Sequence, residues 1–330
     1  MGRIALVVGV LIFLLTIGVY ALVNQQTNAY HFTQTDDPIL GVYEGMTPCG
    51  EANRPLPQIP ANSDCDQMIW KLTLYHDADT GSPTTYQLMS SYGLSQQGTT
   101  GLQGGGTAIN LEGKWDIIRG TKTDPDAVVY QLHADGTESV IRFVRIDDNL
   151  IHVLAPDSTM MVGNGAWSFT LNRTDPAPTA NAPDATSELA NTPLPDTLVD
   201  AAMSGQFDGR SPCAEIILEL QDIPTTAGCQ RVKWRLILHL DDETHLPTTY
   251  ELYNLYVATG DTRYEDTGGW SIVQGTPADP EAIVYQLHSA RLPQPLSFLK
   301  VDDNHLFLLT PDFHFMVGDA FASYTLSRSG

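Results

Sequence analysis

The chain contains much of its sequence twice. With an offset of 164 residues, 45–92 matches 209–256 at 19 of 48 positions. With an offset of 155, 115–173 matches 270–328 at 26 of 59 positions, including the string VYQLH and an Asp-Asp-Asn triplet. This similarity indicates a tandem duplication, so the two copies should share one fold.

The matches also predict the domain boundaries. We expect a first repeat at 38–173 and a second at 205–330. Between them, 174–204 holds five prolines among Ala, Thr and Asp, which is typical of a semi-extended linker. A shorter spacer, 24–37, precedes the first repeat. The offset falls by nine because the first copy is longer in the Gly-rich stretch 93–113, which we expect to be a surface loop, since lengthening a loop costs little free energy.

Each copy has the pattern of short alternating β-strands. Three apolar residues, Trp70, Leu72 and Leu74, occupy every second position, and Trp234, Leu236 and Leu238 repeat them. In the first copy we predict eight strands, at 39–45, 68–75, 84–92, 114–120, 127–133, 140–146, 150–154 and 167–172. Eight antiparallel strands with one apolar face close into a small barrel, which removes exposed edges. The predicted fold is all-β, with two tandem eight-stranded antiparallel barrels; an open sandwich is the alternative.

The amino terminus predicts export. The run from Ile4 to Val23 is apolar or small apart from Thr16 and Tyr20, and as a helix it would cover the hydrocarbon thickness of a bilayer. Arg3 precedes it and the next basic residue is Arg54, which places the amino terminus in the cytoplasm. We expect residues 1–23 to be a retained single-pass anchor in the plasma membrane, or else a cleaved signal peptide. Both alternatives place the rest of the chain outside the cytoplasm.

Two cysteines occur in each copy at the same spacing. Cys49 and Cys65 are 16 positions apart, as are Cys213 and Cys229. In an exported chain, an even and repeated set of this kind predicts one disulfide in each copy. The alternative is a thiolate metal site, which would favour copper(I).

Charge excludes one class of partner. The chain has 17 Lys+Arg against 39 Asp+Glu, a net charge of −22. Such an excess repels phosphate backbones, so we expect no nucleic-acid partner. Its 42% hydrophobic content also distinguishes it from a disordered acidic tail.

Several other residues are candidate ligands with ordinary structural alternatives. His133 and His288 end the two VYQLH strands and could bind metal, although a lone histidine at a strand end is more often simply exposed. The sulfurs of Met160, Met161 and Met316 could be soft copper ligands, or these side chains could fill the core. The triplets at 147–149 and 302–304 lack the spacing of a calcium loop and predict hairpin turns. The chain has no nucleophile elbow, zincin motif or P-loop, so we expect it not to be an enzyme.

The opening of each copy resembles a known family. GVYEGMTPC at 41–49, followed by an alternating strand and TTYQL, is similar to the start of NlpE-type copper-resistance domains, and GQFDGRSPC at 205–213 is a weaker version. The resemblance implies a lipocalin-like barrel of the cell envelope linked to copper tolerance, surface sensing and envelope stress. The family's CxxC pair and lipid-bearing cysteine are absent here.

Together these patterns predict a membrane-anchored extracytoplasmic module that binds or senses a ligand in envelope stress or copper homeostasis. The membrane and an envelope protein are the expected partners, and copper is the one cofactor considered. The alternative function is a carrier that holds a small apolar ligand inside each barrel.

Overall fold

The computed structural model describes residues 30–51, 53–176, 201–221, 223, 228–257 and 261–329. The described residues from Thr35 onward belong to one compact unit that includes both repeats. The predicted anchor, Ile4–Val23, lies outside the described residues, as does 177–200 of the linker. Within the described ranges, no helix has the length and apolarity needed to cross a bilayer.

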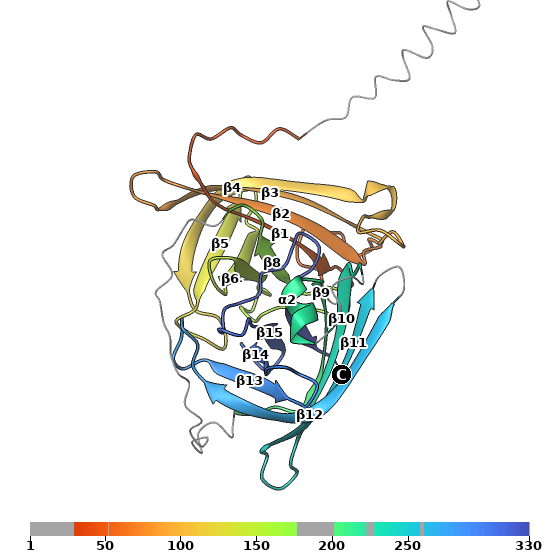
Figure 1. The fold of residues 1–330 in the computed structure, drawn as a ribbon. Coiled ribbons are helices and arrows are strands. Elements are labelled where there is room, and N and C mark those ends of the chain that lie inside the picture. Colours follow the sequence, from red (N-terminus) through yellow and green to blue (C-terminus); the bar gives the residue numbers. More distant parts are fainter. Residues whose placement is uncertain are drawn as a thin grey trace, which may run out of the picture. The chain divides into compact units, whose positions relative to one another are not determined.

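The first repeat is a closed antiparallel barrel in which each strand pairs with the next and the last pairs with the first (Figure 1). Its strands are β1 (Ile39–Pro48), β2 (Gln67–His76), β3 (Pro83–Gly93), β4 (Thr107–Arg119), β5 (Val128–Ala134), β6 (Val140–Arg145), β7 (Leu150–Val153) and β8 (Thr170–Arg173). The predicted eight-stranded barrel is therefore confirmed.

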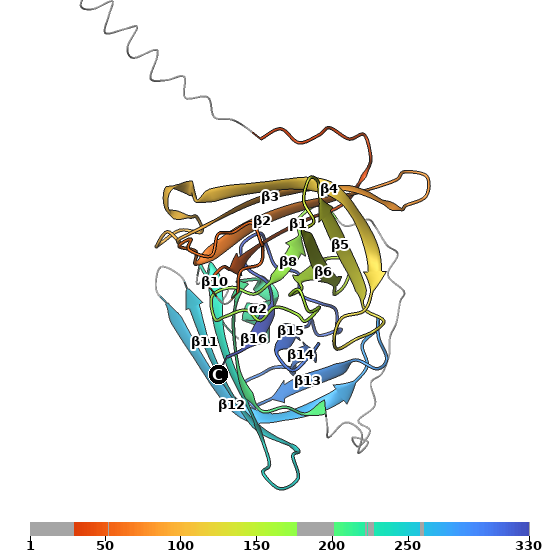
Figure 2. The ribbon, with the colours of Figure 1, turned by 180° about the vertical axis from the view of Figure 1, so that it is seen from behind.

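The second repeat closes in the same order, and its long strands β10 to β12 lie side by side in both views (Figures 1 and 2). Its strands are β9 (Gly205–Pro212), β10 (Arg231–Leu240), β11 (Pro247–Val257), β12 (Thr262–Gln274), β13 (Ile283–His288), β14 (Leu296–Lys300), β15 (His305–Leu308) and β16 (Thr325–Arg328). Two tandem barrels of one topology follow from the duplication.

The alternating residues fill the barrel interiors as predicted. Trp70, Leu72 and Leu74 are at most 1% exposed, and their equivalents in β10 are also buried. A buried indole N–H needs an acceptor, and Trp70 donates to Thr47 Oγ1 at 2.8 Å. Trp234 makes the equivalent bond to Ser211 Oγ, also at 2.8 Å. The same core and the same polar anchor thus recur in both barrels.

The segment after the first strand of each repeat packs onto the core. In the first repeat, Leu56 and Ile59 of this segment are buried in the core cluster. In the second, the segment includes a short helix, α2 (Glu215–Leu220), whose Ile217 and Leu218 are buried in the same way. This helix was not predicted, because six residues give too short a periodic signal.

The Gly-rich stretch 93–113 is only partly the loop we predicted. β4 begins at Thr107 and pairs with β3 from Tyr92↔Thr107 to Tyr86↔Gly113, so the prediction of a loop over this part is wrong. Position 113 requires glycine because the neighbouring strand approaches it closely: a Cβ there would lie 2.0 Å from the carbonyl oxygen of His133. A Cβ at the equivalent Gly268 would lie 2.1 Å from that of His288. These glycines serve strand contact and not loop flexibility.

The two barrels meet through equivalent residues. Ser168 and Ser323, which are 155 positions apart, hydrogen-bond through their hydroxyls at 2.6 Å. The equivalent pair Thr170 and Thr325 does so at 2.9 Å. Contact between equivalent positions is the mark of an isologous, two-fold interface. The repeats are therefore arranged like the subunits of a symmetric homodimer fused into one chain.

Reciprocal bonds extend this pseudo-symmetry. Asn172 Oδ1 accepts from the backbone N–H of Gly318 at 2.8 Å, and Ser327 Oγ accepts from that of Gly163 at 3.2 Å. Residues 172 and 327 are equivalent, as are 163 and 318. An apolar cluster that draws buried residues from both repeats lies beside these bonds: Val129, Val144, Leu150, Leu154, Met160 and Phe307.

Candidate functional site

All four cysteines form disulfides, as the sequence predicted. Cys49 pairs with Cys65 across a Cα–Cα distance of 5.3 Å, and Cys213 pairs with Cys229 across 5.8 Å. Each bridge closes the segment that packs onto the end of its barrel core. In this state the sulfurs are not thiolates, so a copper(I) thiolate site would require reduction.

The candidate histidines lie apart from one another on separate barrels. His133 Nε2 is 3.2 Å from Asp116 Oδ2, and His288 Nε2 is 2.9 Å from Ser271 Oγ. Burial lowers the pKa of His288. Within the described residues, no three His, Cys, Asp or Glu side chains are grouped as a metal site requires.

The candidate methionines and acidic triplets have structural roles. Met160 and Met316 are buried among apolar residues, and the carbonyl of Met161 accepts hydrogen bonds. In the triplets, the backbone N–H groups of Asn149 and Asn304 each donate to the first aspartate of their triplet at 2.8 Å. Both triplets lie between hairpin-connected strands, at the predicted turns.

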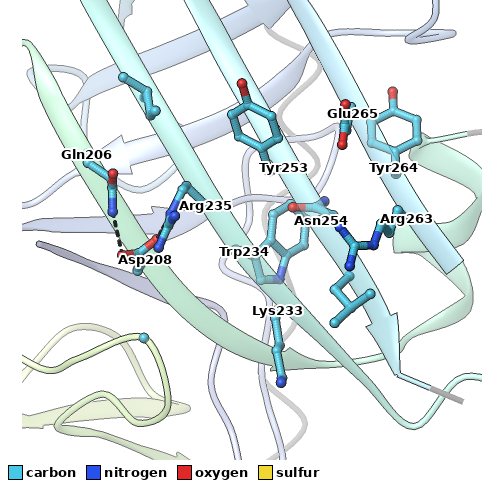
Figure 3. Close-up of a pocket in the computed structure, with 13 residues that line it drawn as sticks. Gln206, Asp208, Lys233, Trp234, Arg235, Tyr253, Asn254, Arg263, Tyr264 and Glu265 are labelled. Carbon is cyan, nitrogen blue, oxygen red and sulfur yellow. Dashed lines mark hydrogen bonds and ion pairs between the residues drawn. The ribbon is translucent and has the colours of Figure 1, made fainter. Parts of the chain in front are cut away.

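A groove of about 620 Å³ lies against β9–β12 of the second barrel. Figure 3 shows the lining residues, nearly all of which come from these strands, and Gly165 of the first repeat completes the lining. We call it the basic groove; its lining residues are Gly165, Gln206, Asp208, Lys233, Trp234, Arg235, Ile237, Tyr253, Asn254, Leu255, Arg263, Tyr264 and Glu265. Since exposed and buried positions alternate along β10, Lys233 and Arg235 lie on the outer face while Trp234 belongs to the core.

The strand register arranges the outer residues into two rows. In the first row, Arg210 pairs with Lys233, Lys233 with Leu255, and Leu255 with Arg263. We call this the cationic row. In the second row, the order is Asp208, Arg235, Tyr253 and Glu265. Positive charge is thus concentrated along one line that crosses four strands.

Two arginines beside the cationic row, Arg235 and Arg231, form ion pairs with carboxylates of the chain. Arg235 Nε donates to Asp208 Oδ1 at 2.9 Å. Burial alone would raise the pKa of Asp208, but hydrogen bonds from Arg235, Ser329 and Gln206, with the charge of Arg235, together lower it. Arg231 donates to Asp319 Oδ2 at 2.9 Å and lies 5.5 Å from the centre of the Phe321 ring. These cations already have counterions.

The cations of the cationic row have no counterion in the described part of the chain. Arg210, Lys233 and Arg263 form no ion pair there. The Nε atom of Arg210 is buried without a hydrogen-bond acceptor. Burial, and then the charge of Arg231, lower the pKa of the Arg210 guanidinium. Arg210 and Lys233 lie directly opposite each other on neighbouring strands, where like charges are destabilising. A bound anion would relieve this repulsion and stabilise the pair.

The first barrel lacks this row. Its equivalents of Arg210, Lys233 and Arg263 are Met46, Ile69 and Ala108, in the same register. Gln67, the equivalent of Arg231, donates to Met46 Sδ and to Thr100 O, so residues of the longer first-copy loop cover part of this face.

Positive charge is concentrated on this face of the second copy. Five of the chain's 17 Lys+Arg lie in or beside the cationic row: Arg210, Arg231, Lys233, Arg235 and Arg263. The cationic row was not predicted from the sequence, although a comparison of charge between the two copies would have indicated it.

A histidine pair was missed as well. His152 and His305 are fully buried between the two barrels, with ring centroids 4.8 Å apart. They occupy different positions of the repeat, since their equivalents are Phe307 and Leu150. Only tertiary packing brings them together.

Comparison with known proteins gives no relative. No protein-family model, no curated protein and no solved structure matches the chain. The resemblance to NlpE-type domains therefore depends on the motifs at 41–49 and 205–213.

Proposed function

We propose that this chain is an exported, membrane-tethered binding module, lipocalin-like in fold and similar to NlpE-type envelope domains, which recognises its ligand in the basic groove. One disulfide per repeat suits an oxidising extracytoplasmic compartment. The apolar run Ile4–Val23 would provide the attachment to the membrane. A part in envelope sensing belongs to the same proposal and derives from the sequence resemblance.

The observation that carries the proposal is the position of the groove on the outside of the second barrel. Both barrel interiors are filled by large side chains such as Trp70, Phe143, Tyr250 and Phe298, each at most 1% exposed. A carrier needs an enclosed apolar cavity, so packed interiors favour recognition on the outer surface over the carrier alternative. The groove combines two cations of the cationic row, Lys233 and Arg263, with apolar contacts from Ile237, Tyr253 and Leu255. Arg210, the third cation, lies beside the groove, opposite Lys233 on β9.

The groove is suited to binding more than to chemistry. Its cations are either paired with carboxylates or exposed, and the hydroxyl of Tyr253, one of its two tyrosines, donates to Glu251 at 2.6 Å. That bond is the main cause of the raised pKa of Tyr253. Such groups attract and orient an anionic ligand, and they do not pair a nucleophile with a base.

In-cell photo-crosslinking would test this proposal. A benzophenone amino acid is placed at Leu255, inside the groove, and in a matched variant at Ser91, the equivalent position of the first barrel. We expect an adduct from position 255 and none from position 91 after irradiation of intact cells. The proposal fails if position 255 gives no adduct, or if both positions give the same adducts. Protease digestion of the barrels in spheroplasts checks their exported location.

A further inference from the structure

We infer that the occupant of the basic groove is an acidic, extended polypeptide segment with the pattern acidic–x–apolar–x–acidic, supplied by a partner protein. This inference rests on the proposed function, because it names the ligand class of the same groove. It is carried by the spacing of the cationic row, the apolar residue within that row, and the contrast with the first barrel.

The spacing of the row favours an elongated ligand. Neighbouring strands lie about 4.8 Å apart, so the row from Arg210 on β9 to Arg263 on β12 extends over roughly 14 Å. A single phosphate or carboxylate is best held by donors that converge on one point. Here the donors are spread along a line, with Leu255 between Lys233 and Arg263.

An extended peptide matches this arrangement. Alternate residues of an extended chain lie about 6.7 Å apart on one side, so residues i, i+2 and i+4 cover roughly 13 Å. Acidic residues at i and i+4 would lie near the Arg210–Lys233 pair and near Arg263, and an apolar residue at i+2 would contact Leu255 and Tyr253. Leu255 is half-buried and Tyr253 is 38% exposed, so both offer apolar surface.

The whole-molecule charge disfavours a long polyanion. A net charge of −22 repels nucleic acid or an anionic membrane at long range. At physiological salt, charges are screened beyond about 8 Å, so a short acidic segment responds mainly to the nearby row. Glu265 lies beside Arg263 on β12 and, with the paired Asp208, limits the net charge of the groove. The site therefore suits a ligand with few charges at defined spacing.

The test uses the full chain and a defined probe. The probe is a fluorophore-labelled peptide, Gly-Ser-Glu-Ser-Leu-Ser-Glu-Ser-Gly, and a control peptide has Gln in place of both Glu residues. Fluorescence anisotropy is measured with wild type, with the triple variant R210Q/K233Q/R263Q, and with the charge-matched variant K71Q/R119Q/K122Q of the first barrel. Both triple variants lower the net charge equally, so only a local effect separates them.

We expect wild type to bind the Glu peptide, with weaker binding at higher salt. The groove variant should weaken binding by roughly tenfold or more, while the first-barrel variant should change it less than about twofold. If the groove variant does not fold, as judged by thermal unfolding, K233Q/R263Q replaces it, because both side chains are exposed and substitution there leaves the core intact.

The inference is overturned if the Gln peptide binds as well as the Glu peptide, if both triple variants lose binding equally, or if the Glu peptide does not bind. It is also overturned if phosphatidylglycerol vesicles, double-stranded DNA or inorganic phosphate bind more tightly than the peptide with the same dependence on the row. In each of these cases a crosslink from position 255 would still support the proposed function, so the two failures are distinguishable.

Discussion

His152 of the first barrel and His305 of the second share one acceptor, the backbone carbonyl oxygen of Met161. The Nε2 atoms lie 2.9 and 3.1 Å from that oxygen. His152 Nδ1 is 3.0 Å from Thr170 Oγ1, which bonds across the interface to Thr325. His305 Nδ1 is 2.8 Å from Asp302 Oδ1. A buried hydrogen-bond network therefore crosses the interface twice.

The network and its burial shift the pKa values of His152 and Asp302. Each ring nitrogen of His305 lies near an oxygen, Nδ1 near the Asp302 carboxylate and Nε2 near the Met161 carbonyl. Burial, and then the charge of His305, lower the pKa of His152 to about 3. Burial alone would raise the pKa of Asp302, but the hydrogen bond and charge of His305 and the hydrogen bond from the backbone N–H of Asn304 together lower it. The ring of His152 thus lies beside the hydrogen bond between His305 and Asp302.

We predict that acid weakens the folded state through His152. The unfolded chain binds a proton at this histidine below about pH 6.5, whereas the folded chain does not until about pH 3. The free energy of unfolding should therefore fall as pH decreases through this window, by up to about 1.4 kcal/mol per pH unit from this group. Asp302 adds to the loss near the acid end, since its lowered pKa stabilises the fold only while the carboxyl is ionised.

Urea unfolding between pH 7.5 and 4 measures this slope. The variant His152→Phe copies the residue at the equivalent position, Phe307, and should flatten the slope. The exposed His133→Gln variant is the control and should leave the slope unchanged. An unchanged slope in His152→Phe would assign the acid sensitivity to other groups.

Gly318→Ala should destabilise the contact between the barrels. A Cβ at this position would lie 2.1 Å from the carbonyl oxygen of Ala322 and 2.7 Å from Asn172 Oδ1. The clash would displace Asn172, which accepts from Gly318 N and donates to the carbonyl oxygens of Asp319 and Ala322. We expect a loss of about 2–3 kcal/mol in chemical denaturation. Gly50→Ala, where nothing lies within 4 Å, should change stability by less than about 0.5 kcal/mol, and equal effects would contradict this account.

Removing either disulfide should cost similar stability. Each bridge joins residues 16 apart, and the chain-entropy model assigns such a loop roughly 3 kcal/mol. The double variants Cys49→Ala/Cys65→Ala and Cys213→Ala/Cys229→Ala should each lower the melting temperature in thermal unfolding followed by circular dichroism. A negligible shift in either variant would mean that packing of the bridged segment against the core holds it without the bond.

Copper(I) binding should depend on reduction. With all four cysteines in disulfides, we expect the oxidised protein not to compete for copper(I) with a colorimetric chelator. After reduction, the free thiols should compete, because thiolate is a preferred copper(I) ligand. Competition by the oxidised protein would instead indicate a site of methionine or histidine ligands.

Local patterns predicted the parts of the fold that depend on neighbouring residues. The alternation around Trp70 and Trp234 indicated the strands, because a strand with one buried face must repeat every second residue. The equal spacing of Cys49–Cys65 and Cys213–Cys229 indicated the bridges. The start of β4 at Thr107 was missed, since glycines there suggested a loop where strand pairing required close backbone approach.

The duplicated sequence therefore determined two barrels of one topology, each with its own core and bridge. Tertiary structure alone brings together the residues of the cationic row and of the buried histidine pair. Arg210, Lys233 and Arg263 are up to 53 positions apart in sequence and form a row only through strand register. His152 and His305 meet only because equivalent surfaces pack across a two-fold contact. Register and interface packing are set by contacts between distant residues, which no local periodicity records.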